Sequence, residues 1–310
     1  MAGRTGAGRT RVLRRYQAPV AKRQPIFIGD VQGCADELEE LLGRAQREYG
    51  DAFEAWVVGD VVNRGPYNLR GLELVRELVD SGRGRFVLGN HELNLLRIAA
   101  GLREPSPLDS VGDVLDSPEL DAWIEWLRSR PLVERGRLGG QDFAMLHAAS
   151  HPDWSLEELV ERARLAEARL AAPKRRDAYS FLAGDPGRDP DLDTLLRLTG
   201  CRSAGTDGGW SAEPPELAPK GQRAWHDLWS ERGHDWGIVY GHWSLQGLHV
   251  ARGLRGLDTG CVHHGRGRDG YLTAWLPDVE GETPFSVPDT RFWRVRARRA
   301  YYIRRDAAKS

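Results

Sequence analysis

The sequence predicts an α/β fold in which short parallel strands alternate with helices. Three apolar runs are too short for helices and rich in β-branched or aromatic residues, which is typical of buried strands. They are Ile26–Ile28, Ala55–Val58 and Phe86–Leu88. A glycine and a cluster of polar residues follow each run. Because crossovers between parallel strands are right-handed, the order strand, helix, strand, helix, strand brings the three clusters to one edge of a sheet.

Two helices are expected between these strands. Residues 34–49 carry leucines and alanine at helical spacing, with acidic residues early and basic residues late, as the helix dipole favours. Residues 69–79 repeat the pattern.

The rest of the chain predicts elements of both kinds. A helix is expected at Pro118–Arg130, and its Trp123 and Trp126 are assigned to the core in preference to a base-stacking platform, because aromatic residues at helical spacing usually pack inside. Ser155 and Glu158 form a capping box that begins a helix ending near residue 171. Further strands are expected at Phe143–Leu146, Gly237–Tyr240, Tyr271–Leu276 and, at a sheet edge, Phe292–Tyr302, while the loop-rich stretch 173–236 has short helical pieces at about 192–198 and 222–229.

The polar clusters after the first three strands mix carboxylates, amides and imidazole. They comprise Asp30 and Gln32, then Asp60, Asn63 and Arg64, then Asn90, His91 and Glu92. Turn chemistry would explain one such cluster, since Asp, Asn and Gly are common where strands end. Three clusters, each directly after a strand, are better explained by a divalent metal, because gathered carboxylates repel each other unless a cation neutralises them.

Five motifs then carry a family resemblance. The segments GDVQG, GDVVNRGP, GNHE, LHAASHPDW and YGHW, in this order, resemble the motifs of the calcineurin-like metallophosphoesterases. Within that superfamily, GNHELNLL and LDTGCV are most similar to the symmetrical bis(5′-nucleosyl)-tetraphosphatases, which split diadenosine tetraphosphate into two ADP. The resemblance covers about residues 25–276 and thins in the middle.

The resemblance implies a fold and a division of the chain. The fold would be two packed mixed β-sheets flanked by helices, with a helical or loop cap inserted. The metallophosphoesterase domain would span residues 25–290, with the cap at about 101–235. A basic flexible extension at residues 1–24 and a basic strand or tail at 291–310 would flank it.

The resemblance also implies roles for single residues around two divalent ions. Asp30 and Gln32 would hold one metal, Asn90, His147 and His242 the other, and Asp60 would bridge both. A hydroxide bridging the metals would attack the phosphate. Arg64 would hold phosphate oxygens with its planar guanidinium. The structural alternative is that Arg64 closes its loop by an ion pair. His91 would be the general acid, with Asn63 beside it in substrate binding.

Two departures from the family pattern bear on chemistry. The wider superfamily has histidine at the position of Gln32. With glutamine there, the site of Asp30, Gln32 and Asp60 has only oxygen donors, which favours Mn²⁺. Co²⁺ would also suit the site that contains His147 and His242. Asn63 stands where protein-phosphatase relatives have an aspartate that orients the acid, which favours a better leaving group than an alkoxide.

Three functions are therefore weighed. The first is hydrolysis of dinucleoside polyphosphates. The second is a phosphoprotein phosphatase or an RNA-cap pyrophosphohydrolase of the same superfamily. The third is a weakly active nucleotide-sensing module.

Other polar residues have no predicted role at the site. Asp258 is expected to anchor a turn rather than to bind metal. The remaining histidines are expected at the surface or in loops, namely His151, His226, His234, His249, His263 and His264.

Composition bounds the class of protein. A chain of 310 residues with 40% hydrophobic content can bury a full core. The net charge of −1 conceals basic ends, with seven basic and no acidic residues at positions 1–24. Nucleic acid could bind there, but solvated tails are the favoured interpretation. The expected partner is a nucleotide, and the oligomeric state is not predicted.

Cysteines and hydropathy indicate the compartment. Three cysteines, Cys34, Cys201 and Cys261, cannot all pair, which favours a reducing cytoplasm. Cys34 and Cys261 are expected to be small buried packing residues. No run resembles a signal peptide or approaches the ~18 apolar residues that span a bilayer, so no membrane partner is expected.

Overall fold

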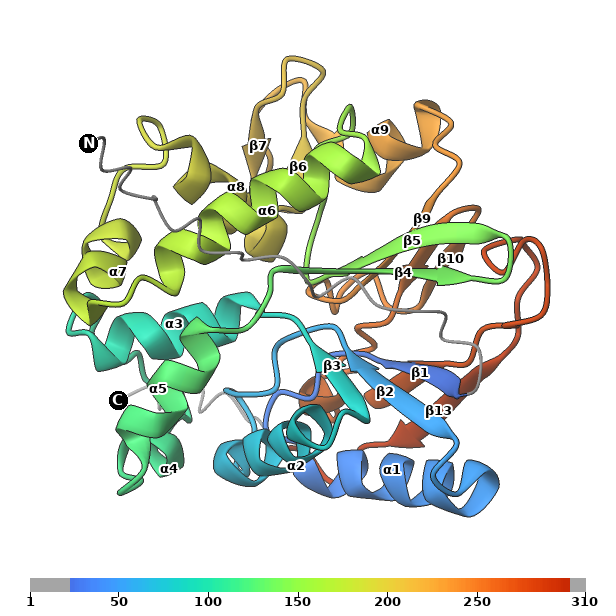
Figure 1. The fold of residues 1–310 in the computed structure, drawn as a ribbon, viewed down its shortest axis with the longest axis horizontal. Helices are drawn as coiled ribbons and strands as arrows, with labels where there is room; N and C mark the ends of the chain where they lie inside the picture. Colours follow the sequence, from blue (N-terminus) through green and yellow to red (C-terminus); the bar gives the residue numbers. More distant parts are fainter. Residues whose placement is uncertain (1–22, 302–310) are drawn as a thin grey trace, which may run out of the picture.

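The computed structural model describes residues 23–301. Most of the predicted basic extension at residues 1–24, and residues 302–310 of the predicted tail, lie outside this range. Two five-stranded sheets form the centre of the molecule (Figure 1). The first has the order β13-β12-β1-β2-β3, with β1 (Gln24–Ile28), β2 (Phe53–Val57), β3 (Gly84–Phe86), β12 (Tyr271–Trp275) and β13 (Phe292–Arg296). Strands β1, β2 and β3 run parallel, whereas β12 and β13 pair antiparallel.

The second sheet has the order β10-β11-β9-β5-β4. Its strands are β4 (Val133–Leu138), β5 (Gln141–Leu146), β9 (Gly237–Tyr240), β10 (His249–Ala251) and β11 (Leu254–Gly256). The central strand β9 is parallel to both β5 and β11. Both sheets are therefore mixed, and the predicted α/β architecture of two mixed sheets is confirmed.

Helices flank the sheets (Figure 1). On the side of the first sheet lie α1 (Ala35–Tyr49) and α2 (Asn68–Asp80). The other helices are α3 (Asn90–Ala99), α4 (Gly112–Leu115), α5 (Leu120–Arg128), α6 (Leu156–Leu170), α7 (Arg175–Leu182), α8 (Pro190–Gly200), α9 (Trp225–Glu231) and the 3₁₀ turn η1 (Cys261–His263). A small sheet of β6 (Ser203–Ala204), β7 (Trp210–Ser211) and β8 (Arg223–Ala224) lies among the later helices.

Aromatic side chains fill the space between the two main sheets. The ring of Phe27 on β1 lies 5.3 Å from the rings of Trp56 and Trp275 on its own sheet and 5.3 Å from Phe143 on β5 of the other sheet. All four are buried. Burial of such large apolar surfaces is the main force that packs the sheets together, at roughly 25 cal/mol per Å².

Several predicted boundaries were wrong. Strand β3 ends at Phe86, because the Leu88 N–H donates to the carbonyl of Pro131 (2.9 Å) instead of joining the ladder. Strand β13 ends at Arg296, because the chain then turns toward α1, where the Arg298 N–H donates to Glu37 (2.7 Å). The helices α3 and α7 were not predicted at all.

Other predictions held in detail. The Ser155 hydroxyl accepts from the Glu158 N–H (3.1 Å) at the start of α6. Trp123 and Trp126 on α5 are buried, with Trp126 stacked on Phe86 at 5.6 Å. Strand β13 does lie at a sheet edge.

Candidate active site

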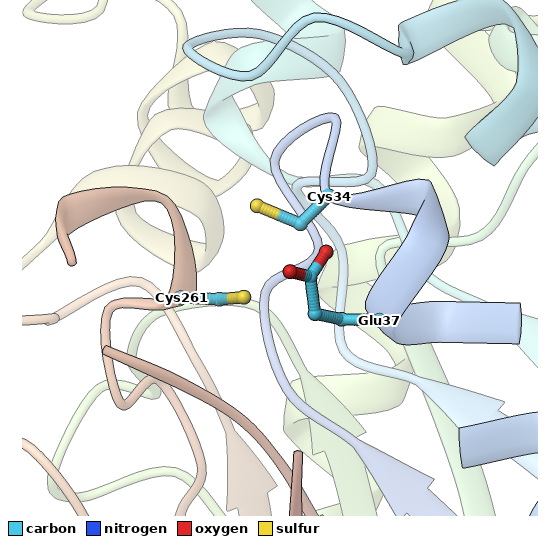
Figure 2. Close-up of side chains that lie close together, drawn as sticks. All are labelled: Cys34, Glu37 and Cys261. Carbon is cyan, nitrogen blue, oxygen red and sulfur yellow. The ribbon is translucent and has the colours of Figure 1, made fainter. Parts of the chain in front are cut away.

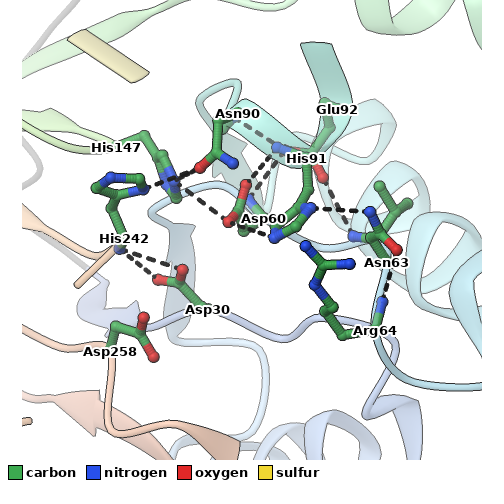
Figure 3. A network of polar contacts seen from close by, with 12 residues as sticks. Asp30, Asp60, Asn63, Arg64, Asn90, His91, Glu92, His147, His242 and Asp258 are labelled. Atoms are coloured by element: carbon green, nitrogen blue, oxygen red, sulfur yellow. Dashed lines mark hydrogen bonds and ion pairs between the residues drawn. The ribbon is translucent and has the colours of Figure 1, made fainter. Parts of the chain in front are cut away.

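Five of the six predicted metal ligands converge where strands of both sheets end (Figure 3). Asp30, Asp60 and Asn90 follow β1, β2 and β3, and His147 and His242 follow β5 and β9. Asp60, His147 and His242 are buried and offer ligand atoms that all lie within 4.8 Å of one another. Residues more than 200 positions apart in the chain thus meet because their strands end on the same side of the packed sheets.

The side-chain oxygen of Asn90 sits between the two histidine rings. Its Oδ1 lies 2.9 Å from Nδ1 of His242 and 3.1 Å from Nε2 of His147. Oδ2 of Asp60 lies 3.4 Å from the same Nε2 of His147.

The far side of each ring determines which nitrogen carries the proton. Nδ1 of His147 lies 2.8 Å from the carbonyl of Val58, and Nε2 of His242 lies 3.1 Å from the carbonyl of Gly200. A carbonyl only accepts, so each ring donates there and the nitrogen that faces Asn90 is bare when the ring is neutral. Burial lowers the pKa of His242 well below its ordinary value, and nearby Arg202 acts in the same direction, so this ring is neutral.

With both rings neutral, bare nitrogens face bare oxygens across this centre. Burial alone would lower the pKa of His147, but the charge of Asp60 outweighs it and raises this pKa, so a proton on Nε2 of His147 relieves part of the repulsion when no metal is bound. Lone pairs at such distances repel unless a cation lies among them, and ring orientation by a backbone carbonyl is how proteins hold metal-ligating histidines. Carboxylate, amide and imidazole donors together suit first-row divalent ions. The residues present fit a divalent metal.

A second group of carboxylates lies beside this centre. Both oxygens of Asp30 accept from the backbone N–H of His242, at 3.1 Å each. Asp258 lies next to Asp30 (Figure 3). Its Oδ1 accepts from the Gly260 N–H (3.0 Å), so it anchors a turn as predicted, but its buried Oδ2 has no hydrogen-bond partner among residues 23–301. Burial, followed by the charges of Asp258 and Asp60, raises the pKa of Asp30 well above its usual value.

Gln32 lies in the loop after β1. It is buried, and its backbone N–H donates to the carbonyl of Asp60 (2.8 Å). The contact fixes its backbone beside Asp60, while its role as a ligand stays a prediction.

The loops that carry the site are strained. Among the described residues, the non-glycine residues with positive φ are Gln32 (47°), Asp60 (50°), Asn63 (79°), Arg64 (68°) and His242 (69°). All belong to the predicted site. The left-handed region is unfavourable for L-residues. Such strained residues cluster at functional sites, where the surrounding structure holds the backbone in place.

Two glycines let the loops approach closely. A Cβ on Gly89 would lie 2.2 Å from Oδ1 of Asp60, and a Cβ on Gly241 would lie 2.0 Å from Oδ1 of Asp30. Either methyl group would displace a carboxylate of the site.

The predicted catalytic residues border the predicted metal ligands. Nε2 of His91 lies 3.7 Å from Oδ2 of Asp60, and its Nδ1 lies 2.9 Å from Nδ2 of Asn63. Burial lowers the pKa of His91. Arg64 donates to the carbonyl of Leu108 (2.8 Å) and lies 3.6 Å from Asp109, while its guanidinium is directed toward Asp60 and His91 (Figure 3). The structure thus contains the alternative ion pair together with the orientation expected of a phosphate ligand.

Sequence reasoning missed the roles of two carboxylates. Glu92 accepts four backbone N–H groups from the loops around it, at 2.8–3.1 Å. Its place in GNHE was the available signal. Asp109 contacts Asn63 from the loop before α4 (2.8 Å), and nothing in its sequence surroundings indicates this.

The other histidines are not brought to the metal ligands. His226 on α9 and His249 on β10 are only partly exposed, which corrects the prediction of surface or loop positions for these two. Their rings lie 4.5 Å apart. The Tyr240 hydroxyl lies 2.6 Å from Nδ1 of His249, and the Gln246 amide nitrogen lies 2.7 Å from Nε2 of His226.

Cys34, Glu37 and Cys261 form a separate buried cluster (Figure 2). Both thiols are buried, which confirms them as packing residues. Both oxygens of Glu37 accept from the Tyr301 hydroxyl (2.6 and 2.8 Å), so the cluster also ties the end of the described chain to α1.

Within residues 23–301, no helix has the length and apolar character needed to cross a membrane.

Comparison with known proteins relates the site to a family. Residues 25–266 match the model of the calcineurin-like phosphoesterases. A symmetrical bis(5′-nucleosyl)-tetraphosphatase of Janthinobacterium sp. (strain Marseille) is 37% identical over 254 residues, covering 77% of this chain and 89% of the relative. The protein of that name from Ralstonia nicotianae is 37% identical over 263 residues, covering 80% and 88%.

Solved structures show the same fold. One of a presumed diadenosine tetraphosphatase gives a TM-score of 0.58 at 21% identity, covering 90% of this chain and 96% of the other. A serine/threonine phosphatase of Saccharomyces cerevisiae gives 0.51 at 15% identity, covering 89% and 80%.

Proposed function

The chain belongs to the calcineurin-like phosphoesterase family, and from that premise we propose that it hydrolyses diadenosine tetraphosphate to two ADP. The relatives at 37% identity that are named symmetrical bis(5′-nucleosyl)-tetraphosphatases support this substrate. The observation that carries the chemistry is that Oδ1 of Asn90 lies 2.9 Å from Nδ1 of His242 and 3.1 Å from Nε2 of His147, the ring nitrogens that face away from the carbonyls of Gly200 and Val58. Orientation of the ring by a backbone carbonyl on its far nitrogen is how proteins hold metal-ligating histidines, so this arrangement supports a divalent ion here.

Two divalent ions would be held by the residues predicted from the sequence. Asp30 and Gln32 would bind one, Asn90, His147 and His242 the other, and Asp60 both. When bound, the ions supply Lewis acidity toward phosphate oxygens and lower the pKa of water from 15.7 toward ~7. Asp258, whose Oδ2 has no hydrogen-bond partner in the described chain, adds negative charge beside the first ion.

The remaining polar side chains would position the substrate. The guanidinium of Arg64 is a planar fork that binds phosphate oxygens in pairs. Asn63 and His91 border the same space, with Nε2 of His91 on the side of Asp60. These groups would hold the polyphosphate so that an inner phosphorus faces the ions.

The identity of the ions and the setting of the enzyme are part of the proposal. Oxygen donors predominate around Asp30, which favours Mn²⁺, whereas Co²⁺ also suits the two histidines. Three free, buried cysteines suit a reducing cytoplasm.

We also propose residues 25–290 as the catalytic domain, with a cap drawn from about 101–235. Strands β4 and β5 within that range belong to the second sheet, so the cap would consist of the helical stretches on either side of them.

Product analysis tests the function. The metal-loaded protein is incubated separately with diadenosine tetraphosphate, a phosphopeptide and a capped RNA. We expect ADP as the sole product from the first and much slower turnover of the others. ATP plus AMP would contradict symmetrical cleavage. Tight binding of the nucleotide without turnover would favour a sensing module instead.

A further inference from the structure

Arg268 lies at the rim of the metal centre, although it belongs to none of the sequence motifs. The last motif, LDTGCV, ends at Val262, and the segment that follows, HHGRGRD, contains two histidines and two arginines. Nη1 of Arg268 donates to the carbonyl of Ser244 (2.6 Å), in the loop that begins with the predicted ligand His242. A guanidinium from outside the motifs is thereby fixed against a loop of the site.

The same guanidinium packs on the turn that carries Asp258. A Cβ on Gly260 would lie 2.7 Å from Nη2 of Arg268, so the guanidinium lies directly against this glycine. The Gly260 N–H in turn donates to Oδ1 of Asp258 (3.0 Å). Burial raises the pKa of Asp258, and the charge of Arg268 acts in the opposite direction. Arg268 therefore contacts both loops, after β9 and after β11, that border Asp30.

No carboxylate within residues 23–301 neutralises Arg268. In that range the side chain forms no ion pair, and the bond to Ser244 is its one hydrogen bond. The neighbouring Asp269 pairs with Arg296 instead (2.8 Å). Arg268 is half-buried, so its remaining N–H donors are within reach of a bound molecule.

His263 shows that Arg268 and Arg64 border the same side of the site. Burial lowers the pKa of His263 to about 4. The positive charges of Arg268, Arg266 and Arg64 act in the same direction. The ring is therefore neutral, and guanidiniums from two separate segments, the loop after β2 and the loop after η1, lie around it.

We propose that Arg268 is a second phosphate-binding residue, which holds the phosphate group next to the one that reacts. The inference rests on the proposed function and deepens it by assigning a binding residue outside the motifs. Arg64 would bind the reacting phosphate, and Arg268 its neighbour on the side of Asp258. A planar guanidinium binds two phosphate oxygens at once, and no carboxylate of the described chain competes for this one.

The position beside Asp258 has a physical reason. The carboxylates of Asp30, Asp60 and Asp258 repel any phosphate that the metal ions do not shield. Phosphates that extend past the ions on this side would meet that repulsion, and the guanidinium of Arg268 offsets it. Because Arg268 would hold a phosphate that does not react, its contact contributes to binding of the substrate and of the transition state alike.

Titration calorimetry with two inorganic probes tests the proposal. The full chain, with Mn²⁺ in excess, is titrated with orthophosphate, which can occupy only the reacting position, and with tripolyphosphate, which extends to the neighbouring one. Arg268→Ala should weaken binding of tripolyphosphate about 10–100-fold, as for loss of charge-assisted hydrogen bonds, and leave the affinity for orthophosphate close to that of the wild type. Any other pattern, such as equal losses for both probes or no loss for either, would overturn the proposal.

Two further variants separate phosphate binding from a structural tie to Ser244. A glutamine can still donate to the Ser244 carbonyl but carries no charge, so Arg268→Gln should bind tripolyphosphate as weakly as Arg268→Ala does. Arg268→Lys keeps the charge without the planar fork and should recover part of the affinity. Full recovery in Arg268→Gln would show that the arginine only holds the loop, and the proposal would be wrong.

Arg252→Ala is the matched control. Arg252 is exposed and, like Arg268, forms no ion pair within the described part of the chain. It lies in the turn between β10 and β11, and β11 begins beside Ile238, at the opposite end of β9 from His242. Removing its charge should change neither affinity. A loss equal to that of Arg268→Ala would mean that net charge alone attracts the probe.

Kinetics with diadenosine tetraphosphate complete the test. Arg268→Ala should raise KM with little change in kcat, because the contact is made before and during the reaction. A fall in kcat at unchanged KM would contradict this. The calorimetric probes contain no nucleotide, so failure to cleave diadenosine tetraphosphate alone would refute the proposed substrate and leave the assignment of Arg268 standing.

Discussion

Glu92 binds the backbone of Asp60. Its Oε2 accepts from the Asp60 N–H at 2.9 Å, and the same carboxylate accepts from Val61, Val62 and Gly89. A fully buried carboxylate thus joins the loop after β2 to the start of α3. The side chains of Asp60 and Asn90, which come from these two segments, are held in register as a result.

Replacing Glu92 by glutamine should destabilise the protein. The amide NH₂ would face N–H donors that now have an acceptor, and leaving buried donors unsatisfied costs about 1–3 kcal/mol each. Urea unfolding should show a free energy of unfolding lower by at least this amount. Glu39→Gln, at a partly exposed position that pairs with Arg70, is the control and should change little. An unchanged midpoint in Glu92→Gln would show that these contacts do not stabilise the fold.

After removal of metal, the free energy of unfolding should depend on whether the Asp258 carboxyl is protonated. Burial, with the Asp60 charge, raises the pKa of Asp258 from 3.8 to about 6. Between these values the folded chain binds more protons than the unfolded chain, so the free energy of unfolding falls as pH rises through the window and stays low above it. The chelated protein should therefore gain a stabilising contribution as pH falls from about 6 toward 4.

Thermal melts of the chelated wild type and of Asp258→Asn isolate this contribution. The variant lacks the titrating carboxyl, so the difference between the two proteins should change across the window. A constant difference would argue against the raised pKa. The rise in Tm on adding Mn²⁺ should also shrink toward low pH, because protons compete with metal for the ligands.

Gln32→His should change the metal preference. A neutral amide oxygen makes the Asp30 site rich in oxygen donors, whereas imidazole shifts preference toward Fe, Co and Zn. Titration with metal content as the readout should show tighter binding at the first site in the variant and turnover with a wider range of ions. Identical affinities and the same metal ranking would mean that Gln32 is not a ligand.

His91→Asn should lower kcat while metal content is retained. Loss of one donor aimed at developing charge costs about 10²–10³-fold. The proposed ligand is the neighbouring Asn90, whose Oδ1 lies between His147 and His242. Elemental analysis of the purified variant provides the check, and loss of metal would show that the two roles were assigned to the wrong residues.

The sequence predicted those parts of the site that follow from strand ends and short motifs. Asp30, Asp60 and Asn90 could be found because each follows an apolar run and a glycine. The contact of Asn63 with Asp109 could not, since it joins a strand end to a loop whose composition shows only that it is a loop. Helix α3 was missed because its first turn coincides with the polar cluster, which drew attention to chemistry at positions that also begin a helix. Helix α7 has only a few buried residues in a polar stretch, too few for a clear period.

The positive φ angles of Gln32, Asp60, Asn63, Arg64 and His242 have an evolutionary consequence. Each angle costs an L-residue roughly 1–2 kcal/mol that glycine would not incur. Arg64→Gly would relieve the backbone and at the same time remove the proposed phosphate ligand. Selection for thermal stability alone should therefore remove activity at these positions first, and a duplicated copy freed from its catalytic duty should drift toward glycine or asparagine there before its core changes.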